Sequence, residues 1–346
     1  MKFRRKKMTS PALPGALGGL LRLSRNLDGE KFPSWASKPE RERTKEKILQ
    51  AAQEIDSTAA FIPFDSIHQV EGFAPFAEGS PADSSSSGVI VFTSNPDKRI
   101  TVNGENHLEL EYACNGIDLM GIWSKLDEFD TLLSERLDYA WSPRLGYLTA
   151  TSANIGTALL AETLVQLPGF HLLRELNAVT TALDRLDYRV RNIDSTECPF
   201  PAALYRISNR ITIGKDEETL IKNVMRVTEK LLKREWMARL RVIFNHSVFL
   251  MADYVGRALA TAKSAFLVSQ SECIQLLFIL RFGVEMNLVK GITLEEVDEI
   301  LGTAQKAESV QAQFGDGFDI PEFQLEQAYA DFLNFSIQDV DIELNY

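Results

Sequence analysis

The chain has 346 residues, of which 45% are hydrophobic and 25% charged, so it has the composition of a globular protein large enough for two domains. Its net charge of −11 argues against a general nucleic-acid binder. No apolar run approaches the roughly 20 residues that span a bilayer, so we expect no membrane association. Three widely spaced cysteines argue against a disulfide framework and predict a cytoplasmic protein.

The sequence also argues against a metal site and against a signal peptide. The four histidines are scattered, and no cysteine lies near a second Cys or His at zinc-ligand spacing, so we expect no metal site in the protein itself. The N-terminus is basic but is followed by a segment rich in Pro and Gly. We therefore expect a flexible tail over 1–17 rather than a signal peptide.

Hydrophobic periodicity predicts alternating strands and helices in the first two thirds of the chain. Strands are expected at 89–92, 99–102, 107–112, 188–191 and 203–207, with strand and loop at 61–76 and a loop at 80–88. Helices are expected at 39–55, 117–135, 155–166 (capped by Asn154), 169–183 and 215–240.

The last third reads as helical, with expected helices at 242–259, 271–288 and 294–304. This change of character divides the chain into 18–240, a helical domain at 241–310, and an acidic, aromatic segment at 311–346. The acidic segment could dock on a partner or on its own domain, or it could be a solvated terminal helix with a frayed end.

One polar stretch joins two alternating apolar runs. It reads Val102-Asn103-Gly104-Glu105-Asn106-His107-Leu108 and carries the carboxylate of Glu105. Taken alone, it is a hairpin turn, because Asn-Gly is a common turn dipeptide.

Three more stretches change this interpretation. They are Leu23-Ser-Arg-Asn-Leu27 followed by Phe32-Pro33, Leu145-Gly-Tyr-Leu-Thr149 followed by Ala150-Thr-Ser-Ala-Asn-Ile-Gly-Thr157, and Tyr205-Arg-Ile-Ser-Asn209 with Gly214. In this order and spacing, the four stretches resemble the ATP:guanido phosphotransferases, most closely the bacterial protein arginine kinase branch. The resemblance covers roughly residues 18–240 and continues more weakly through Arg281-Phe-Gly283 and Val289-Lys-Gly-Ile292.

The resemblance implies an α+β fold, with a large, mostly antiparallel sheet covered by helices and a helical C-terminal domain. It implies transfer of a phosphoryl group from ATP, with Mg²⁺, to a guanidinium, with a protein as substrate or partner, and it allows a homodimer. By position, Glu105 matches the catalytic glutamate, and Arg22, Arg25, Arg191 and His107 are candidates for nucleotide binding. The matching substrate loop carries Thr151, Asn154 and Thr157.

The sequence departs from the family pattern at several of these positions. Of five expected phosphate-binding arginines, Arg22 and Arg191 remain, while the other three positions hold Leu20, Glu109 and Leu160. Thr151 stands where the family has a cysteine, and the glycines and glutamate expected after Arg191 are missing. Four other arginines could compensate: Arg144, Arg189, Arg206 and Arg210. Because one transition-state arginine can contribute about 10³–10⁵ in rate, these losses predict weak turnover.

Two hypotheses follow. The chain is a divergent protein arginine kinase, or it is a catalytically silent pseudokinase that binds arginine, phosphoarginine or a partner protein. A free-arginine phosphagen kinase is disfavoured, because those enzymes carry a helical domain before the catalytic one and little precedes residue 18. The retained residues also have structural interpretations: Glu105 as a solvated turn carboxylate, Arg22 and Arg25 as a surface pair, and Arg191 as a partner of Asp187 or Asp194.

Overall fold

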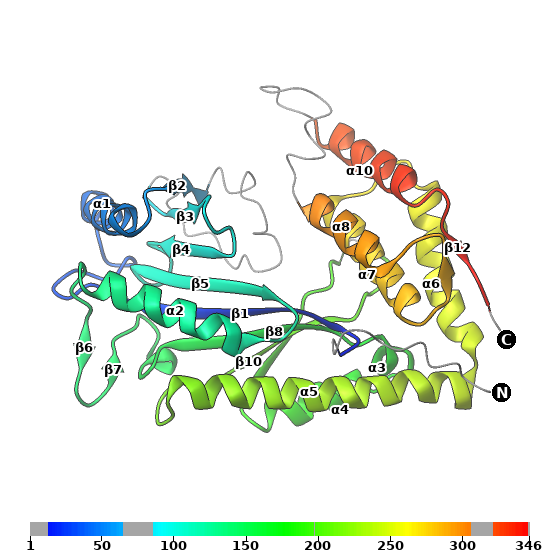
Figure 1. Ribbon diagram of the computed structural model, residues 1–346, viewed down its shortest axis with the longest axis horizontal. Helices are drawn as coiled ribbons and strands as arrows, with labels where there is room; N and C mark the ends of the chain where they lie inside the picture. Colours follow the sequence, from blue (N-terminus) through cyan, green and yellow to red (C-terminus); the bar gives the residue numbers. More distant parts are fainter. Residues whose placement is uncertain (1–12, 65–85, 197, 306–320, 345–346) are drawn as a thin grey trace.

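A computed structural model describes residues 13–64, 86–196, 198–305 and 321–344. Among these residues the chain forms an eight-stranded, wholly antiparallel sheet with the order β2-β3-β4-β5-β1-β8-β10-β9 (Figure 1). The helices of the last third gather at one end of this sheet (Figure 1). The expected α+β architecture is therefore confirmed.

The strands of the main sheet are β1 Ala16–Arg25, β2 Ala59–Pro63, β3 Gly88–Phe92, β4 Lys98–Val102, β5 Leu108–Asn115, β8 Leu159–Gln166, β9 Tyr188–Asn192 and β10 Leu204–Asn209. Two short ribbons pair β6 Trp141–Ser142 with β7 Gly146–Tyr147, and β11 Val289–Lys290 with β12 Asp341–Ile342.

The helices are α1 Lys38–Ile55, α2 Leu119–Ser134, α3 Pro168–Leu172, α4 Leu176–Asp184, α5 Glu217–Arg241, α6 Val248–Ser264, α7 Gln270–Glu285, α8 Leu294–Gln305 and α10 Glu322–Ser336. A 3₁₀ turn covers Ser152–Asn154, and a π-helical turn covers Val242–His246 between α5 and α6.

Alternation along the central strand β1 separates the two faces of the sheet. Leu21 and Leu23 belong to a core that α1, α2 and α5 close from one side. Leu20 and Arg22 point to the opposite face, where paired residues of β5 and β8 also carry charge. We call this second surface the polar face.

The C-terminal helices share a core with the far end of the sheet. Leu204 of β10 packs in the same cluster as Val255 of α6 and Phe282 of α7. A buried ion pair strengthens this junction, because Arg239 of α5 lies between Glu235 of its own helix (2.8 Å) and Glu285 of α7 (2.6 Å). The helical third is thus anchored to the sheet by both apolar and charged contacts.

Most expected elements are present, but two of the expected helices were wrong. The run 155–166 is not a helix: Leu159–Gln166 is β8, which lies between β1 and β10 and is buried almost throughout. β8 reads LLAETLVQ, and because both of its faces are buried it lacks the alternation of apolar and polar residues that marks a strand with one exposed face. The expected helix 169–183 is divided into α3 and α4 near Arg174, whose φ is +59°.

Part of the expected acidic segment is ordered within the molecule. α10 buries Ala328, Tyr329 and Leu333 in the C-terminal core, so this stretch docks on its own domain. Of the tail expected over 1–17, residues 1–12 lie outside the described residues, and the expectation was wrong at its end, because β1 begins at Ala16. Most of the loop at 80–88 and the start of the acidic segment also lie outside the described residues. Within the described ranges, no helix combines the length and apolar character needed to cross a bilayer.

Candidate functional site

The hairpin turn that carries Glu105 connects β4 to β5. It is closed by the backbone N–H of Asn103, which donates to the carbonyl of His107 (2.9 Å), and Asn103 adopts a φ of +50°. Glu105 is exposed at the tip. Its carboxylate accepts a hydrogen bond from the Thr151 hydroxyl. Two stretches that lie 46 residues apart in sequence therefore meet side chain to side chain.

Buried amides hold this turn in place. Asn106 is 1% exposed, and its side-chain oxygen accepts from Asn26 Nδ2 (2.8 Å) and from the backbone N–H of Ala150 (2.9 Å). Asn26 in turn accepts from the N–H of His107 (2.9 Å). The segment after β1, the hairpin and the Thr151 loop are thus linked through one amide pair, which limits how far Glu105 can move.

His107 supports the turn instead of facing a ligand. Its ring is 1% exposed; Nδ1 accepts from the N–H of Leu27 (3.0 Å) and Nε2 lies 2.8 Å from the carbonyl of Lys31. Burial lowers the pKa of His107, so the ring is neutral at pH 7. These contacts argue against the nucleotide-binding role expected for it.

Two glycines set the conformation of the loop that carries Thr151. Gly146 (φ +73°) and Gly156 (φ +102°) lie against each other, and a Cβ on Gly146 would come 2.4 Å from the Gly156 carbonyl. Thr157 donates to the carbonyl of Thr212 (3.2 Å), which ties this loop to the segment after β10. Asn154 ends the 3₁₀ turn beside Thr151 and does not cap a helix. The three expected loop residues therefore share one compact segment.

The retained Arg22 lies in the middle of the polar face. Its Nε is 2.5 Å from Glu111 Oε1 and 3.7 Å from Glu109 Oε2, both on β5. Glu111 also accepts from Arg99 of β4. Burial opposes the charged form of Arg22, but Glu111 and Glu109 outweigh it, so the pKa of Arg22 is raised. For Glu111 the two arginines likewise outweigh burial and lower its pKa.

The positions of the lost arginines adjoin Arg22. Leu160 of β8 pairs with Arg22, and Leu20 pairs with Glu162 of β8, so both project onto the polar face. Together with Glu109, these positions form one contiguous area. Four of the five positions at which the resemblance implies phosphate-binding arginines therefore lie close together, and three of these four hold leucine or glutamate.

Other arginines occupy the far end of the same face. Arg206 of β10 pairs with both Leu164 of β8 and Arg191 of β9, and its Nε lies 3.7 Å from Glu162. Arg189 pairs with Ser208 and projects to the same side. From strand spacing, the Cα atoms of Arg22 and Arg191 are roughly 20 Å apart. Arg191 thus lies on the edge strand β9, well away from Arg22 in the middle of the polar face.

The remaining candidate arginines are elsewhere. Arg25 lies on the opposite, helix-covered side, where it is 2% exposed, bonds Asp130 of α2 (2.6 Å) and stacks over Tyr147 (3.5 Å from the ring centre). This placement corrects both expectations for Arg25, as a phosphate ligand and as a surface residue. Arg210 pairs with Asp184 on the outer surface, and Arg144 is exposed in the β6–β7 turn.

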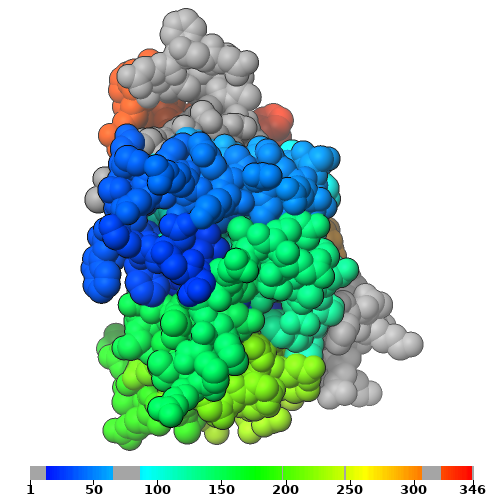
Figure 2. All heavy atoms as spheres, turned by 90° about the vertical axis from the view of Figure 1, so that its left-hand side faces the viewer, coloured from blue at the N-terminus to red at the C-terminus, as the bar shows by residue number. Residues whose placement is uncertain are grey.

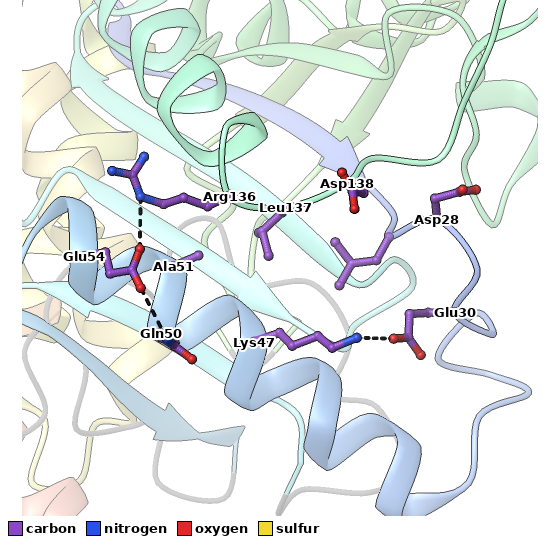
Figure 3. Close-up of a pocket in the computed structure, with 10 residues that line it drawn as sticks. Asp28, Glu30, Lys47, Gln50, Ala51, Glu54, Arg136, Leu137 and Asp138 are labelled. Atoms are coloured by element: carbon purple, nitrogen blue, oxygen red, sulfur yellow. Dashed lines mark hydrogen bonds and ion pairs between the residues drawn. The ribbon is translucent and has the colours of Figure 1, made fainter.

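Two pockets flank the site, and the larger one contains none of the expected residues. It holds about 350 Å³ between α1, the segment after β1 and the end of α2, where Lys47 contacts Glu30 and Arg136 lies 3.3 Å from Glu54 (Figure 3). Figure 2 shows this side of the molecule, with α1 above the segment that follows β1. A second pocket of about 230 Å³ lies between Arg206 and Leu164 of the sheet and Gln275 of α7, and so adjoins the polar face. We therefore place the site by its side chains and not by pocket size.

Three charged residues of the polar face were not predicted from the sequence: Arg99, Glu111 and Glu162. Their signal was present, because Glu109 and Glu111 stand two apart on a predicted strand and must share a face. Which arginines oppose them depends on strand order, which the sequence does not state. In the described ranges, no group of three or more His, Cys, Asp or Glu side chains could hold a metal ion.

Comparison with known proteins identifies the family of the chain. The family described as "ATP:guanido phosphotransferase, C-terminal catalytic domain" matches residues 45–238, more than half of the chain, and "Protein-arginine kinase McsB C-terminal domain" matches residues 249–340. The chain therefore belongs to the ATP:guanido phosphotransferase family.

Several individual proteins and solved structures are similar to the chain. The protein-arginine kinase of Halothermothrix orenii is 29% identical over 291 residues, which cover 82% of this chain and 83% of the relative. Among solved structures, lombricine kinase matches 65% of this chain and 67% of its own (TM-score 0.55, 20% identity). The duplicated taurocyamine kinase from Schistosoma mansoni matches 96% of this chain and 48% of its own (TM-score 0.60, 16% identity). At these identities, the two structures support the fold alone.

Proposed function

We propose that this protein is a protein arginine kinase-like phosphotransferase, which moves the γ-phosphoryl group of ATP to the guanidinium of an arginine in a protein. The observation that carries the proposal is the contact between Glu105 and Thr151, on the two loops that the family resemblance assigns to the guanidinium. The relatives named protein-arginine kinase, which match most of the chain, support a protein substrate.

The chemistry requires a carboxylate at this point. A guanidinium has a pKa above 12, so its nitrogen attacks phosphorus only when it is oriented and gives up a proton. Glu105 would accept that proton as the N–P bond forms and the bond from the γ-phosphorus to ADP breaks. Its exposure and its fixed loop suit this role, and Thr151 would orient its carboxylate.

The arginines of the polar face would bind the nucleotide. Arg191, Arg206 and Arg189 would contact phosphates near the β9 edge of the sheet and Arg22 would contact them near its middle, and a triphosphate with long arginine side chains would bridge the distance between them. Mg²⁺ would arrive with ATP and neutralise charge between its phosphates. The pocket beside Arg206 would accommodate the rest of the nucleotide.

A second candidate function, a catalytically silent binding module, has one specific observation in its favour. Arg22 is already neutralised by Glu111 at 2.5 Å and approached by Glu109, so a phosphate must compete with two carboxylates. We therefore propose slow turnover, and binding without turnover as the alternative.

Calorimetric titration of Mg·ATP tests the nucleotide site. The wild type should bind in the micromolar-to-millimolar range, Arg191→Ala should weaken binding, and Arg210→Ala, whose arginine pairs with Asp184 on the outer surface, should not. Acid-labile phosphate on arginine-containing proteins, absent with Glu105→Gln, supports the kinase. Binding without such product supports the silent module, and no binding at millimolar nucleotide contradicts the kinase.

We also propose a cytoplasmic location, where ATP and reduced thiols coexist; Cys114, Cys198 and Cys273 are all free thiols. The division into 18–240, 241–310 and 311–346 and the homodimer remain predictions. Sedimentation of the purified protein tests the dimer.

A further inference from the structure

Glu109 is a charged residue of the polar face without an assigned role. It is the second residue of β5, two positions after the hairpin that carries Glu105, and its side chain is 12% exposed. Its carboxylate accepts from Asn106 Nδ2 at 3.2 Å and lies 3.7 Å from Arg22 Nε. The same Asn106 is locked by Asn26 and Ala150, so Glu109 is held in register with the hairpin.

The charge of Glu109 is less well compensated than that of its neighbour Glu111. Arg22 is 2.5 Å from Glu111 and 3.7 Å from Glu109, and Arg99 adds a second cation to Glu111. Burial raises the pKa of Glu109; Arg22 opposes this, while Glu111 and Glu105 reinforce it. A further cation beside Glu109 would therefore be stabilised.

Glu105 and Glu109 would offer a guanidinium two anchoring points. A guanidinium is planar and has five N–H donors, so one carboxylate satisfies one edge and leaves the other edge unpaired. A second carboxylate on the same hairpin would fix the plane and the direction of the attacking nitrogen. Asn106, which lies between them in sequence and donates to Glu109, is itself fixed by Asn26 and Ala150.

We propose that Glu109 is a substrate-binding residue that holds the guanidinium of the substrate arginine together with Glu105. The inference rests on the proposed function, since it places the guanidinium at the Glu105 hairpin. The resemblance implies a phosphate-binding arginine at position 109. The glutamate found there would instead recognise the cationic substrate.

The test is binding of a short peptide with a single arginine to the full-length protein, measured calorimetrically without nucleotide. Glu109→Gln should weaken binding about 10- to 100-fold, as expected for loss of a charge-assisted hydrogen bond, and Glu109→Asp should weaken it less. Glu128→Gln removes an exposed carboxylate of α2 and should leave binding unchanged. A peptide with lysine in place of arginine should bind more weakly to the wild type.

Glu109→Arg separates this role from a merely structural one. It should lose the peptide and tighten Mg·ATP binding, because a cation then adjoins Arg22 in place of an acid. If the wild-type protein binds the peptide and Glu105→Gln weakens that binding while Glu109→Gln does not, the role of Glu109 is overturned and the proposed function survives. If neither Glu105→Gln nor Glu109→Gln affects peptide binding, or if the wild type does not bind the peptide, the role of Glu109 and the proposed function are both overturned. Should Glu109→Gln not fold, equal affinity of Glu109→Asp and wild type overturns the inference.

Discussion

Arg22 and Glu111 face each other across β1 and β5, with Arg22 Nε 2.5 Å from Glu111 Oε1 in the middle of the sheet. Glu111 is 2% exposed and also contacts Arg99, so one buried carboxylate neutralises two arginines. Arg22, at a position where the resemblance implies a phosphate-binding arginine, thus contacts a glutamate of the protein itself. This pairing and the residues around it should therefore affect both stability and phosphate binding.

Glu111→Gln should lower the free energy of unfolding by about 3 kcal/mol, because Arg22 and Arg99 lose the buried carboxylate that they share. Inorganic triphosphate should recover part of that loss by binding the released arginines. Urea unfolding with and without triphosphate measures both effects. Asp253→Asn, which breaks an exposed ion pair with Arg257, should leave stability within error. Unchanged stability in Glu111→Gln would show that the pair contributes nothing.

Glu109→Gln should be more stable than the wild type at pH 7. Burial raises the folded-state pKa of Glu109 above its ordinary value, so keeping it ionised costs stability as pH rises through that pKa. The difference between variant and wild type should be smallest below pH 4.5, the ordinary value for a glutamate, and should grow towards neutrality. Urea unfolding across this pH range measures the difference in stability. A variant less stable than the wild type at pH 7 would contradict the claim that the ionised Glu109 costs stability.

His107→Ala should lower the free energy of unfolding by about 2 kcal/mol, since buried backbone groups of Leu27 and Lys31 lose their partners. Burial lowers the pKa of His107, so wild-type stability should decline as pH falls below 6.5, and the variant should lack part of this decline. His171, whose pKa burial also lowers, should account for a remaining part. If the pH profile of stability is unaltered in the variant, His107 is not a cause of the decline at low pH.

Gly146→Ala should destabilise the Thr151 loop strongly, because the added Cβ would meet the Gly156 carbonyl at 2.4 Å and the residue keeps a φ of +73°. Gly29→Ala is the matched control: its φ is +71°, but the added Cβ would have no heavy atom within 4 Å. The control should cost about 1 kcal/mol from backbone strain alone. Thermal unfolding and arginine-peptide binding of both variants measure the difference, and equal losses would refute the importance of the Gly146–Gly156 contact.

Sequence reasoning recovered the short-range features of the fold well. Alternation identified β3, β4 and β5, and helical periodicity identified α1, α2 and α5, because these signals depend on residues a few positions apart. It failed at β8, whose two buried faces remove the alternation, and it did not assign β1 as a strand. The resemblance supplied the overall architecture that periodicity alone did not.

For the site, the sequence by itself determined which chemical groups are present: a hairpin glutamate, two retained arginines, and an acid at position 109. Only the tertiary structure decided what these groups face. Strand order placed Arg22 against Glu111, and the pleat turned Arg25 to the helix-covered side while Arg206 and Arg191 shared the polar face. The reason is physical: side-chain direction follows local backbone geometry, whereas charge pairing depends on strands brought together from distant parts of the chain.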